Sequence, residues 1–379
     1  MHYRIMGKTG VETSLLGYGC MRFPTLENGK IDRYEATRLL LKAYENGVNY
    51  FDTAWPYHGG ESERFVGEFF RTTGLRDKVY LATKLPVWEV EKLEDAERIF
   101  DEQLKHLKTD YIDFYLLHAL NAERFDKMVE LGVVKLLEGY KEEGKIKNFG
   151  FSFHDSYETF ERIIKYRDWD FCQIQLNYMD TEIQAGLKGY ELAKELGVPL
   201  VIMEPAKGGA LTNYAADVNR IFTDAAPDKS VASWAFRWVG SFRNVKVILS
   251  GMTKMEQLDD NLKTFDNFEP LTAEESPLVD KLVATVRART FNGCTGCRYC
   301  VPCPGGVEIP RVFRIWNDYG MYNNANAAKR AYFHDMKPEA RADNCLECGV
   351  CETACPQSLS IRENLKAAHS LFESLQKAE

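Results

Sequence analysis

Two short runs of cysteine near the C-terminal end of the chain have the residue type and spacing of metal ligands. The first run, "CTGCRYCVPC", precedes a proline and contains Cys294, Cys297, Cys300 and Cys303. The second run, "CLECGVCETAC", also precedes a proline and contains Cys345, Cys348, Cys351 and Cys355. The spacing C-x₂-C-x₂-C-x₃-C-P is typical of cysteines that hold [4Fe–4S] clusters, and the first run differs from it by one residue in the last gap. We therefore predict two [4Fe–4S] clusters.

Zinc and disulfide bonds are the alternatives for these thiols. Structural zinc sites use C-x₂-C pairs that are well separated in sequence, and a disulfide framework spreads its cysteines along a short chain. Cys20 and Cys172 stand alone and are expected to be small core residues. Cysteines gathered in metal-ligand spacing indicate a reducing compartment, so we expect a cytoplasmic protein.

The order of the cysteines also predicts how the two clusters share them. In two-cluster proteins of this type, the fourth cysteine of each run ligates the other cluster. Pro304 turns the chain away directly after the last cysteine of the first run. We expect one cluster at Cys294, Cys297, Cys300 and Cys355, and the other at Cys345, Cys348, Cys351 and Cys303.

A second set of reactive side chains lies in the first half of the chain. Asp52, Lys84 and His118 each stand at or next to the end of an apolar run, and Tyr57 lies five residues beyond Asp52. Singly, each has a structural explanation, such as a turn cap, a solvent-directed lysine or a core histidine. Together they combine a proton donor, a cation, an anion and an imidazole, which is a set suited to acid–base catalysis.

The elements that must position these residues are eight apolar runs that alternate with amphipathic stretches. The runs are "SLLGYG" from Ser14, "VNYFD" from Val48, "VYLATK" from Val79, "IDFYLLH" from Ile112, "NFGFS" from Asn148, "FCQIQL" from Phe171, "PLVIME" from Pro199 and "VKVILS" from Val245. Helical patterns between them include 33–46, 91–107, 125–143, 182–196 and 255–265. Eight strand–helix units with apolar strands predict an α/β fold, a closed (β/α)₈ or TIM barrel. A doubly wound open sheet is the alternative, but it would need a glycine-rich phosphate loop, which the sequence lacks.

Composition narrows the class of protein further. The chain has 379 residues, 45% hydrophobic residues and a net charge of −8. This acidic balance argues against a general nucleic-acid binder, and no apolar run is long enough for a membrane span. We expect a barrel domain over residues 1–280 and a small, mainly helical domain over 281–379, where "VFRIWNDYG" and "NAAKRAYFHDMKPEA" have helical patterns.

The first domain resembles the aldo-keto reductase family. "FDTAWPYHGGESERFVG" is similar to the family's signature around its catalytic aspartate and tyrosine, and the contexts of Lys84 and His118 are similar to its other two catalytic positions. "GKIKNFGFS", "CQIQLNY" and "SGMTKMEQLDDNL" follow in the family's order. The resemblance covers residues 1–270 and implies an oxidoreductase that reduces a carbonyl compound, or oxidises an alcohol, with NAD(P)H.

The resemblance implies a role for each of the four residues. Tyr57 is the general acid, and Lys84 lowers the pKa of its hydroxyl from the ordinary value near 10. Asp52 holds Lys84 and compensates its buried charge. His118 orients the carbonyl group and donates to its oxygen as negative charge develops there.

The resemblance also implies nucleotide contacts. Ser152 and Gln173 should hold the carboxamide, and Met203 should face the nicotinamide ring. Lys207, Gly208 and Gly209 are suited to the pyrophosphate. The last motif is expected to meet the rest of the nucleotide through Gly251, Thr253, Lys254, Gln257 and Asn261. One lysine and no arginine is a weak site for a 2′-phosphate, so we expect the use of NADH, or of both nucleotides.

The C-terminal domain resembles helical ferredoxin domains that carry electrons between partners. A nicotinamide delivers two electrons as a hydride, whereas each cluster moves one, and the sequence contains no flavin motif. Three hypotheses follow: a reductase whose clusters exchange electrons with a partner protein, a reductase whose clusters are structural, and a nucleotide-binding redox sensor with little turnover.

Overall fold

The computed structural model describes residues 1–212 and 214–377. The chain divides into two compact units, Met1–Thr212 with Lys229–Ala273, and Asn213–Asp228 with Glu274–Glu379 as far as these stretches are described. The predicted boundary at residue 280 lies inside helix α11, Ser276–Arg287, so the structural division comes a few residues earlier. The short segment before Lys229, which the sequence places within the barrel, belongs to the second unit.

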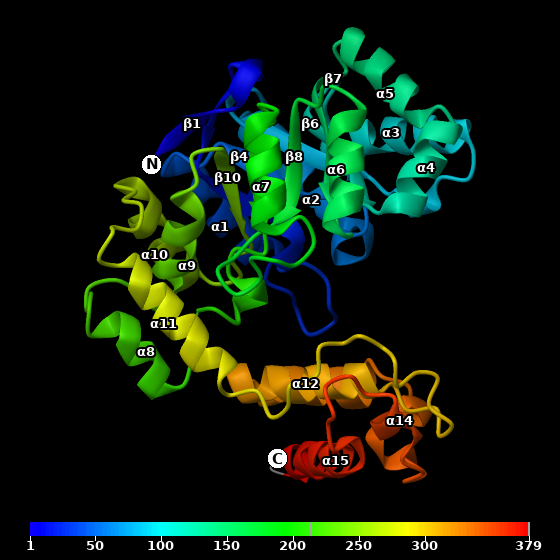
Figure 1. Ribbon diagram of the computed structural model, residues 1–379. Helices are drawn as coiled ribbons and strands as arrows, with labels where there is room; N and C mark the ends of the chain where they lie inside the picture. Colours follow the sequence, from blue (N-terminus) through cyan, green and yellow to red (C-terminus); the bar gives the residue numbers. More distant parts are fainter. Residues whose placement is uncertain (213, 378–379) are drawn as a thin grey trace. The chain divides into compact units, whose positions relative to one another are not determined.

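The first unit is a closed barrel of eight parallel strands in the order β10-β3-β4-β5-β6-β7-β8-β9, with helices around it (Figure 1). All eight predicted strands are present. They are β3 Leu16–Gly19, β4 Tyr50–Asp52, β5 Tyr80–Leu85, β6 Ile112–Leu120, β7 Ile146–Phe153, β8 Phe171–Gln175, β9 Leu200–Met203 and β10 Val245–Ser250. The predicted (β/α)₈ barrel is therefore confirmed.

Where a range was predicted, the barrel helices agree with it to within four residues, except in one place. They are α1 Arg33–Glu45, α2 Glu61–Thr73, α3 Leu93–Leu107, α4 Ala122–Glu130, α5 Val133–Glu142, α6 Tyr157–Tyr166, α7 Gly186–Glu195, α9 Val231–Gly240 and α10 Met255–Asp266. The single helix predicted over 125–143 is two helices, because Gly132 adopts a left-handed conformation with φ of 77° between them. A glycine takes this conformation without the steric cost that other residues incur.

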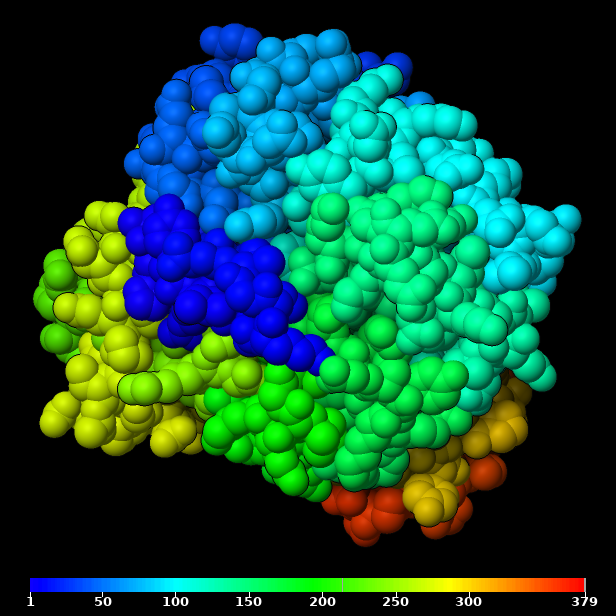
Figure 2. Space-filling view, turned by 90° about the horizontal axis from the view of Figure 1, so that it is seen from above, coloured from blue at the N-terminus to red at the C-terminus, as the bar shows by residue number. Residues whose placement is uncertain are grey.

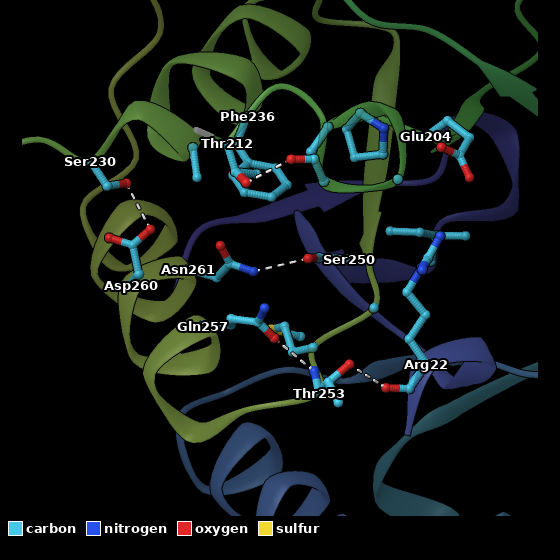
Figure 3. A pocket seen from close by; sticks show the side chains of 18 of the residues that line it. Arg22, Glu204, Thr212, Ser230, Phe236, Ser250, Thr253, Gln257, Asp260 and Asn261 are labelled. Atoms are coloured by element: carbon cyan, nitrogen blue, oxygen red, sulfur yellow. Dashed lines mark hydrogen bonds between the residues drawn. The ribbon is translucent and has the colours of Figure 1, made fainter. Parts of the chain in front are cut away.

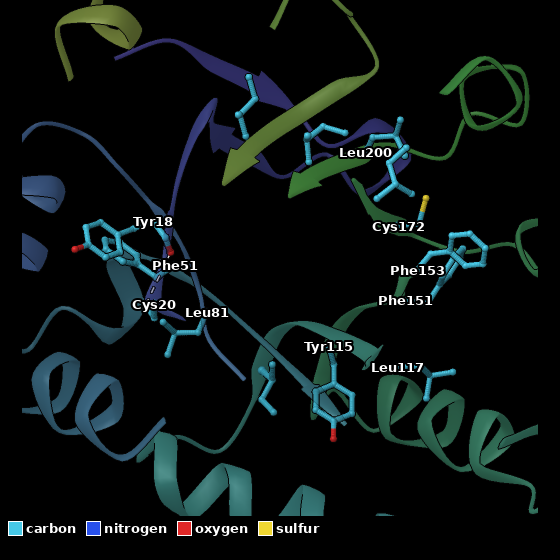
Figure 4. Packing of buried hydrophobic residues seen from close by; sticks show 14 of the residues in the cluster. Tyr18, Cys20, Phe51, Leu81, Tyr115, Leu117, Phe151, Phe153, Cys172 and Leu200 are labelled. Carbon is cyan, nitrogen blue, oxygen red and sulfur yellow. Dashed lines mark hydrogen bonds between the residues drawn. The ribbon is translucent and has the colours of Figure 1, made fainter. Parts of the chain in front are cut away.

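Side-chain alternation along the strands separates two cores. Tyr50, Phe114 and Phe171 belong to a cluster inside the barrel, whereas Phe51 and Tyr115 pack outward against the helices (Figure 4). Successive side chains of a strand point to opposite faces. Asp52, Lys84, His118 and Gln173 follow the interior residues of their strands at even spacing, so they point inward at the carboxyl ends.

An N-terminal hairpin covers the other end of the barrel. Strands β1 Tyr3–Ile5 and β2 Glu12–Ser14 pair antiparallel, and the N-terminal residues lie across the face that Figure 2 shows. Met6 is fully buried with the interior cluster. The hairpin thus covers the amino end of the barrel.

The second unit is helical. Its helices are α8 Ala216–Thr223, α11, α12 Ile309–Tyr322, α13 Ala325–Lys329, α14 Val350–Thr353 and α15 Ile361–Lys377. Helices α12 and α15 lie side by side (Figure 1) and bury Phe313, Trp316 and Leu365 in a core of their own. The mainly helical domain is confirmed, but the helix predicted over "NAAKRAYFHDMKPEA" is too long. The α-helix ends at Lys329 and is followed by one π-helical turn, Arg330–His334. The helix does not continue to Ala340, because Lys337 precedes a proline and is disfavoured in the helical conformation.

Among the helices of the described residues, none combines the length and the hydropathy that a lipid bilayer span requires.

Candidate active site

A buried ion pair lies at the carboxyl end of the barrel. Lys84 Nζ donates to Asp52 Oδ1 at 2.7 Å, to the carbonyl of Thr53 at 2.7 Å and to Tyr57 Oη at 3.5 Å. The Lys84 and Asp52 side chains are 2% and 3% exposed. The structure therefore brings together the aspartate, the lysine and the tyrosine that the sequence predicts, with the ammonium between the carboxylate and the phenol.

Burial and the neighbouring charges oppose each other at this pair. Burial would lower the pKa of Lys84, but the Asp52 carboxylate and the Tyr57 hydroxyl raise it above its ordinary value, so the ammonium keeps its proton. Burial raises the pKa of Tyr57, and the Lys84 charge acts against this rise without cancelling it. The predicted lowering by Lys84 is present as a contribution, but desolvation is larger in this structure.

His118 completes the set of four residues, Asp52, Tyr57, Lys84 and His118, which we call the tetrad. Its ring lies edge-on to the Tyr57 ring, with the two centroids 6.2 Å apart. The centroid of the Trp88 ring is 5.0 Å from that of His118. Burial, and then the Lys84 charge, lower the pKa of His118 to about 2, so the imidazole is neutral at physiological pH. Within the described part of the chain, its Nδ1 has no hydrogen-bond partner. A neutral imidazole beside the phenol can donate one hydrogen bond to a substrate oxygen.

A cavity of about 470 Å³ lies among the loops after β3, β9 and β10 (Figure 3). Six of the predicted nucleotide contacts line it: Gly208, Gly209, Gly251, Thr253, Gln257 and Asn261. Gln257 Oε1 accepts from the backbone N–H groups of Thr253 and Lys254, which fixes the start of α10. Asn261 Nδ2 donates to Ser250 Oγ at 2.9 Å. The volume and the mixed polar and apolar lining suit a small organic ligand.

Five predicted nucleotide residues do not line this cavity: Ser152, Gln173, Met203, Lys207 and Lys254. Lys207 Nζ is bound to the Asp180 carboxylate at 2.6 and 2.7 Å, so its charge is already compensated.

Ser152 and Gln173 lie inside the barrel, near the tetrad end. They pair in register on β7 and β8, and Ser152 Oγ accepts from Ala119 N at 2.7 Å. Gln173 is buried, and among the described residues its Oε1 has no partner. A buried amide oxygen without a donor is expected where a ligand supplies one. This position therefore fits the carboxamide of a nicotinamide, as the resemblance implies.

The sequence interpretation missed other residues of the cavity wall, among them Arg22, Ser230, Glu256 and Asp260. Arg22 follows β3 in a short helix, Cys20–Arg22, and its side chain packs close to Gly251. It is the one lysine or arginine among the described lining residues. Its position after the first barrel strand is a signal that could have found it, because loops after all eight strands meet at one face.

The structure brings the first three cysteines of the first run together with Cys355, and Cys351 lies near Cys303 and Cys345. A small cavity is lined by Cys294, Cys297, Cys300 and Cys355, with Ile309 and Phe313 among its apolar walls. Burial first, and then Glu352, Cys303 and Cys345, raise the pKa of Cys351 to about 11, which places these two cysteines near it. Cys297 and Cys348 are exposed. Among the described residues, no three Cys, His, Asp or Glu side chains are close enough to hold a single metal ion.

An eight-stranded barrel with a buried aspartate and lysine, a tyrosine and a histidine at its carboxyl end is the arrangement that the resemblance predicts. The sequence model of the aldo/keto reductase family matches residues 15–284, and the chain belongs to this family. The model of a 4Fe-4S dicluster domain matches residues 293–360. The predicted architecture, an aldo-keto reductase with a C-terminal ferredoxin-like domain, is thereby confirmed.

Relatives and solved structures match the barrel part of the chain. An oxidoreductase of Bacillus subtilis, YqkF, is 27% identical over 306 residues, which are 73% of this chain and 94% of the relative. The NADH-specific methylglyoxal reductase of Escherichia coli is 25% identical over 302 residues, 68% of this chain and 91% of the relative. An aldo-keto reductase from Bacillus halodurans in its holo form superposes with a TM-score of 0.63 at 26% identity, covering 74% of this chain and 96% of that one.

Proposed function

We propose that this protein reduces an aldehyde or ketone, or oxidises the corresponding alcohol, with a nicotinamide nucleotide and with Tyr57 as the acid. The observation that carries this proposal is the buried contact of Lys84 Nζ with both Asp52 Oδ1 and Tyr57 Oη. A buried positive charge beside a phenol at the carboxyl end of the barrel is an arrangement suited to delivering a proton to an oxygen that becomes negative.

The chain's own residues then have separate tasks. The nicotinamide, when bound, supplies or accepts the hydride, since no side chain can do so. Tyr57 Oη gives its proton to the carbonyl oxygen, and Lys84 stabilises the phenolate that remains. Asp52 keeps the ammonium charged and in place. His118, which is neutral because burial lowers its pKa to about 2, orients the carbonyl group and donates to its oxygen.

The nucleotide is proposed to lie from Gln173 and Ser152 to the cavity of Figure 3. Met203 would face the ring, as the family resemblance suggests. The cavity wall contains Arg22 and three carboxylates, Glu204, Glu256 and Asp260. Because these carboxylates outnumber the cation, a second phosphate dianion would be poorly compensated there. This supports the use of NADH, or of both nucleotides, and a relative in Escherichia coli is named as NADH-specific.

Replacement of Tyr57 by phenylalanine tests the tetrad. Tyr57→Phe should lower kcat by about 1000-fold, the range of a positioned general acid, and leave nucleotide affinity unchanged, because the acid acts in the transition state. Tyr34→Phe, at a tyrosine that is 72% exposed, is the matched control. Full activity of Tyr57→Phe on every carbonyl compound that the wild type reduces would contradict the proposal.

The C-terminal unit is proposed to hold two [4Fe–4S] clusters that exchange electrons with a partner protein. Cys297 and Cys348 are exposed, and exposed apolar side chains stand beside the cysteines of both runs, namely Tyr299, Leu346 and Val350. Apolar side chains around an exposed redox centre suit transient contact with another protein. Structural clusters would gain nothing from this exposure, and a pure sensor would not need the tetrad.

The cluster potentials separate these alternatives. A redox titration followed by EPR on anaerobically purified protein should give midpoint potentials near that of the nicotinamide couple. Clusters that stay in one oxidation state throughout this range would favour a structural role. We further propose that the protein is cytoplasmic and that its substrate is a small carbonyl or alcohol compound.

A further inference from the structure

The first turn of α2 lies directly behind the tetrad. Ser62 Oγ donates to the carbonyl of Cys20 at 3.2 Å and shares a hydrogen bond of 2.8 Å with Thr53 Oγ1. The carbonyl of Thr53 in turn accepts from Lys84 Nζ. This turn therefore supports one of the three oxygen atoms that surround the catalytic ammonium.

The next residue of the turn, Glu63, is a buried carboxylate to which the proposed mechanism gives no task. It is 1% exposed. Its Oε1 accepts from Thr83 Oγ1 at 2.5 Å and from Gln103 Nε2 at 2.6 Å, and its Oε2 lies 3.3 Å from His106 Nδ1. These donors and the helix N-terminus compensate the charge. A purely structural role would be filled at lower cost by apolar packing, since burying a carboxylate requires all these partners.

The hydrogen bonds of Glu63 with Thr83, Gln103 and His106 form a network, and one side of this network reaches Lys84. Thr83 is the residue before Lys84 on β5, and Gln103 Nε2 also donates to the Lys84 carbonyl at 3.0 Å. Gln103 Oε1 accepts from Tyr115 Oη at 2.6 Å, which fixes the orientation of the amide. The end of β5 is therefore held from the helix side at two consecutive residues.

The other side of the network reaches the loop of Tyr57. The His106 ring stacks on Trp55 with centroids 5.4 Å apart and an angle of 22° between the planes. Trp55 is two residues before Tyr57. A carboxylate that binds His106 thus also restrains the loop on which the phenol is mounted.

Gly67 permits this arrangement, one helical turn after Glu63. A Cβ atom at Gly67 would lie 2.2 Å from the carbonyl oxygen of His106. Only glycine lets α2 approach α3 this closely, and this approach brings Glu63 within reach of Gln103 and His106.

We infer that Glu63 is a positioning residue that sets the separation of Lys84 Nζ and Tyr57 Oη, 3.5 Å in this structure, by bracing the end of β5 and the Tyr57 loop together. This inference rests on the proposed function, because the separation matters only if Tyr57 is the proton donor. The groups that face Tyr57 are Lys84 from β5, Asp52 from β4, His118 from β6 and Cys20 from the short helix after β3.

The test uses the full chain and its best carbonyl substrate. Glu63→Gln should lower kcat by about 100-fold, the scale of a misplacement near 1 Å, with the KM for the nucleotide within about twofold of the wild type. If Lys84 lies farther from Tyr57 in the variant, its charge lowers the pKa of the phenol less than in the wild type. The loss of carbonyl reduction at high pH, where Tyr57 loses its proton, should therefore move to higher pH. Glu68→Gln, on the same helix but paired with Arg71 at the surface, is the control.

A second pair of variants guards against a folding defect. Thr83→Val removes one donor to Glu63 at nearly constant volume, and Thr83→Ser keeps it. Thr83→Val should lower kcat and move the pH profile in the same direction, and Thr83→Ser should restore both. Should Glu63→Gln fail to fold, this pair decides the question alone.

The outcomes separate the inference from the proposed function. Full activity of Tyr57→Phe would overturn the proposed function and the inference with it. If Tyr57→Phe is inactive but Glu63→Gln, or Thr83→Val in its place, changes only the melting temperature and leaves kcat and its pH profile as in the wild type, the positioning role alone is overturned.

Discussion

The barrel site and the cysteine loops differ in what holds their reactive side chains in place. In the barrel, Lys84 and Asp52 are nearly inaccessible, and they stand on the neighbouring strands β5 and β4. In the second unit, Cys297 and Cys348 are exposed. The barrel site is organised by the protein itself, whereas the cysteine loops supply ligands for a group that would organise them. A change in the barrel should therefore act on catalysis, and a change in the loops on cofactor content.

The largest effect is expected at Lys84. Lys84→Met should lower kcat by about 1000-fold or more, because the phenol loses the cation beside it. It also leaves Asp52 buried without its partner, which costs about 3–5 kcal/mol of stability. The double variant Asp52→Asn/Lys84→Met should recover most of the stability in thermal denaturation and none of the activity. Recovery of activity in the double variant would show that the charge itself is not used.

Removal of single cysteines sharpens the comparison. Cys355→Ser should abolish the cluster of the first run, and Cys303→Ser the cluster of the second, because each fourth ligand belongs to the other run. Iron analysis and EPR should find about four iron atoms in place of about eight, with a different signal lost in each variant. Cys172→Ala, outside both runs, should keep full iron content. If each variant instead lost the cluster whose other three ligands stand in the same run, the crossed arrangement would be refuted. Zinc at either site would remove the basis of this prediction.

A smaller effect concerns acid stability. Burial lowers the folded-state pKa of His118 to about 2, whereas the unfolded value is about 6.5. The unfolded chain therefore binds the proton first as pH falls below about 6.5, and stability is lost there. Between pH 7 and pH 5 this amounts to about 2 kcal/mol. His118→Gln should flatten this part of the profile of unfolding free energy against pH. An unchanged slope would mean that His118 titrates alike in both states.

The smallest expected effect is at Arg22. Its charge lies among the lining residues of the cavity near Gly208 and Gly251, so Arg22→Ala should weaken NADH and NADPH alike, by about tenfold or 1.4 kcal/mol. Equilibrium titration of nucleotide fluorescence measures this. The wild type should bind NADPH little better than NADH. A preference for NADPH beyond about a hundredfold, roughly 2.7 kcal/mol, would show that the 2′-phosphate has a cation of its own.

Strand positions were predictable because buried parallel strands are continuous apolar runs, and all eight were found. The tetrad was predictable because strand ends converge at one face.

The ion pair of Lys207 could not be predicted from the sequence. Its partner Asp180 is distant in sequence, so a free cation was expected where the structure has a compensated one. Arg22 and Glu63 were missed because their significance depends on packing between loops and helices. The break at Gly132 was missed because the hydrophobic pattern continues through it.

The most direct test of the account asks where the new hydrogen on the product carbon comes from. Reduced nucleotide with deuterium at the transferred position is mixed anaerobically with the cluster-loaded protein and its carbonyl substrate, in ordinary water. Direct hydride transfer beside Tyr57 predicts one deuterium on the carbinol carbon of the alcohol, with the same label in the Cys303→Ser and Cys355→Ser variants. An unlabelled alcohol, or label that depends on the clusters, would show that the electrons pass through iron and that the barrel tetrad does not carry the reaction.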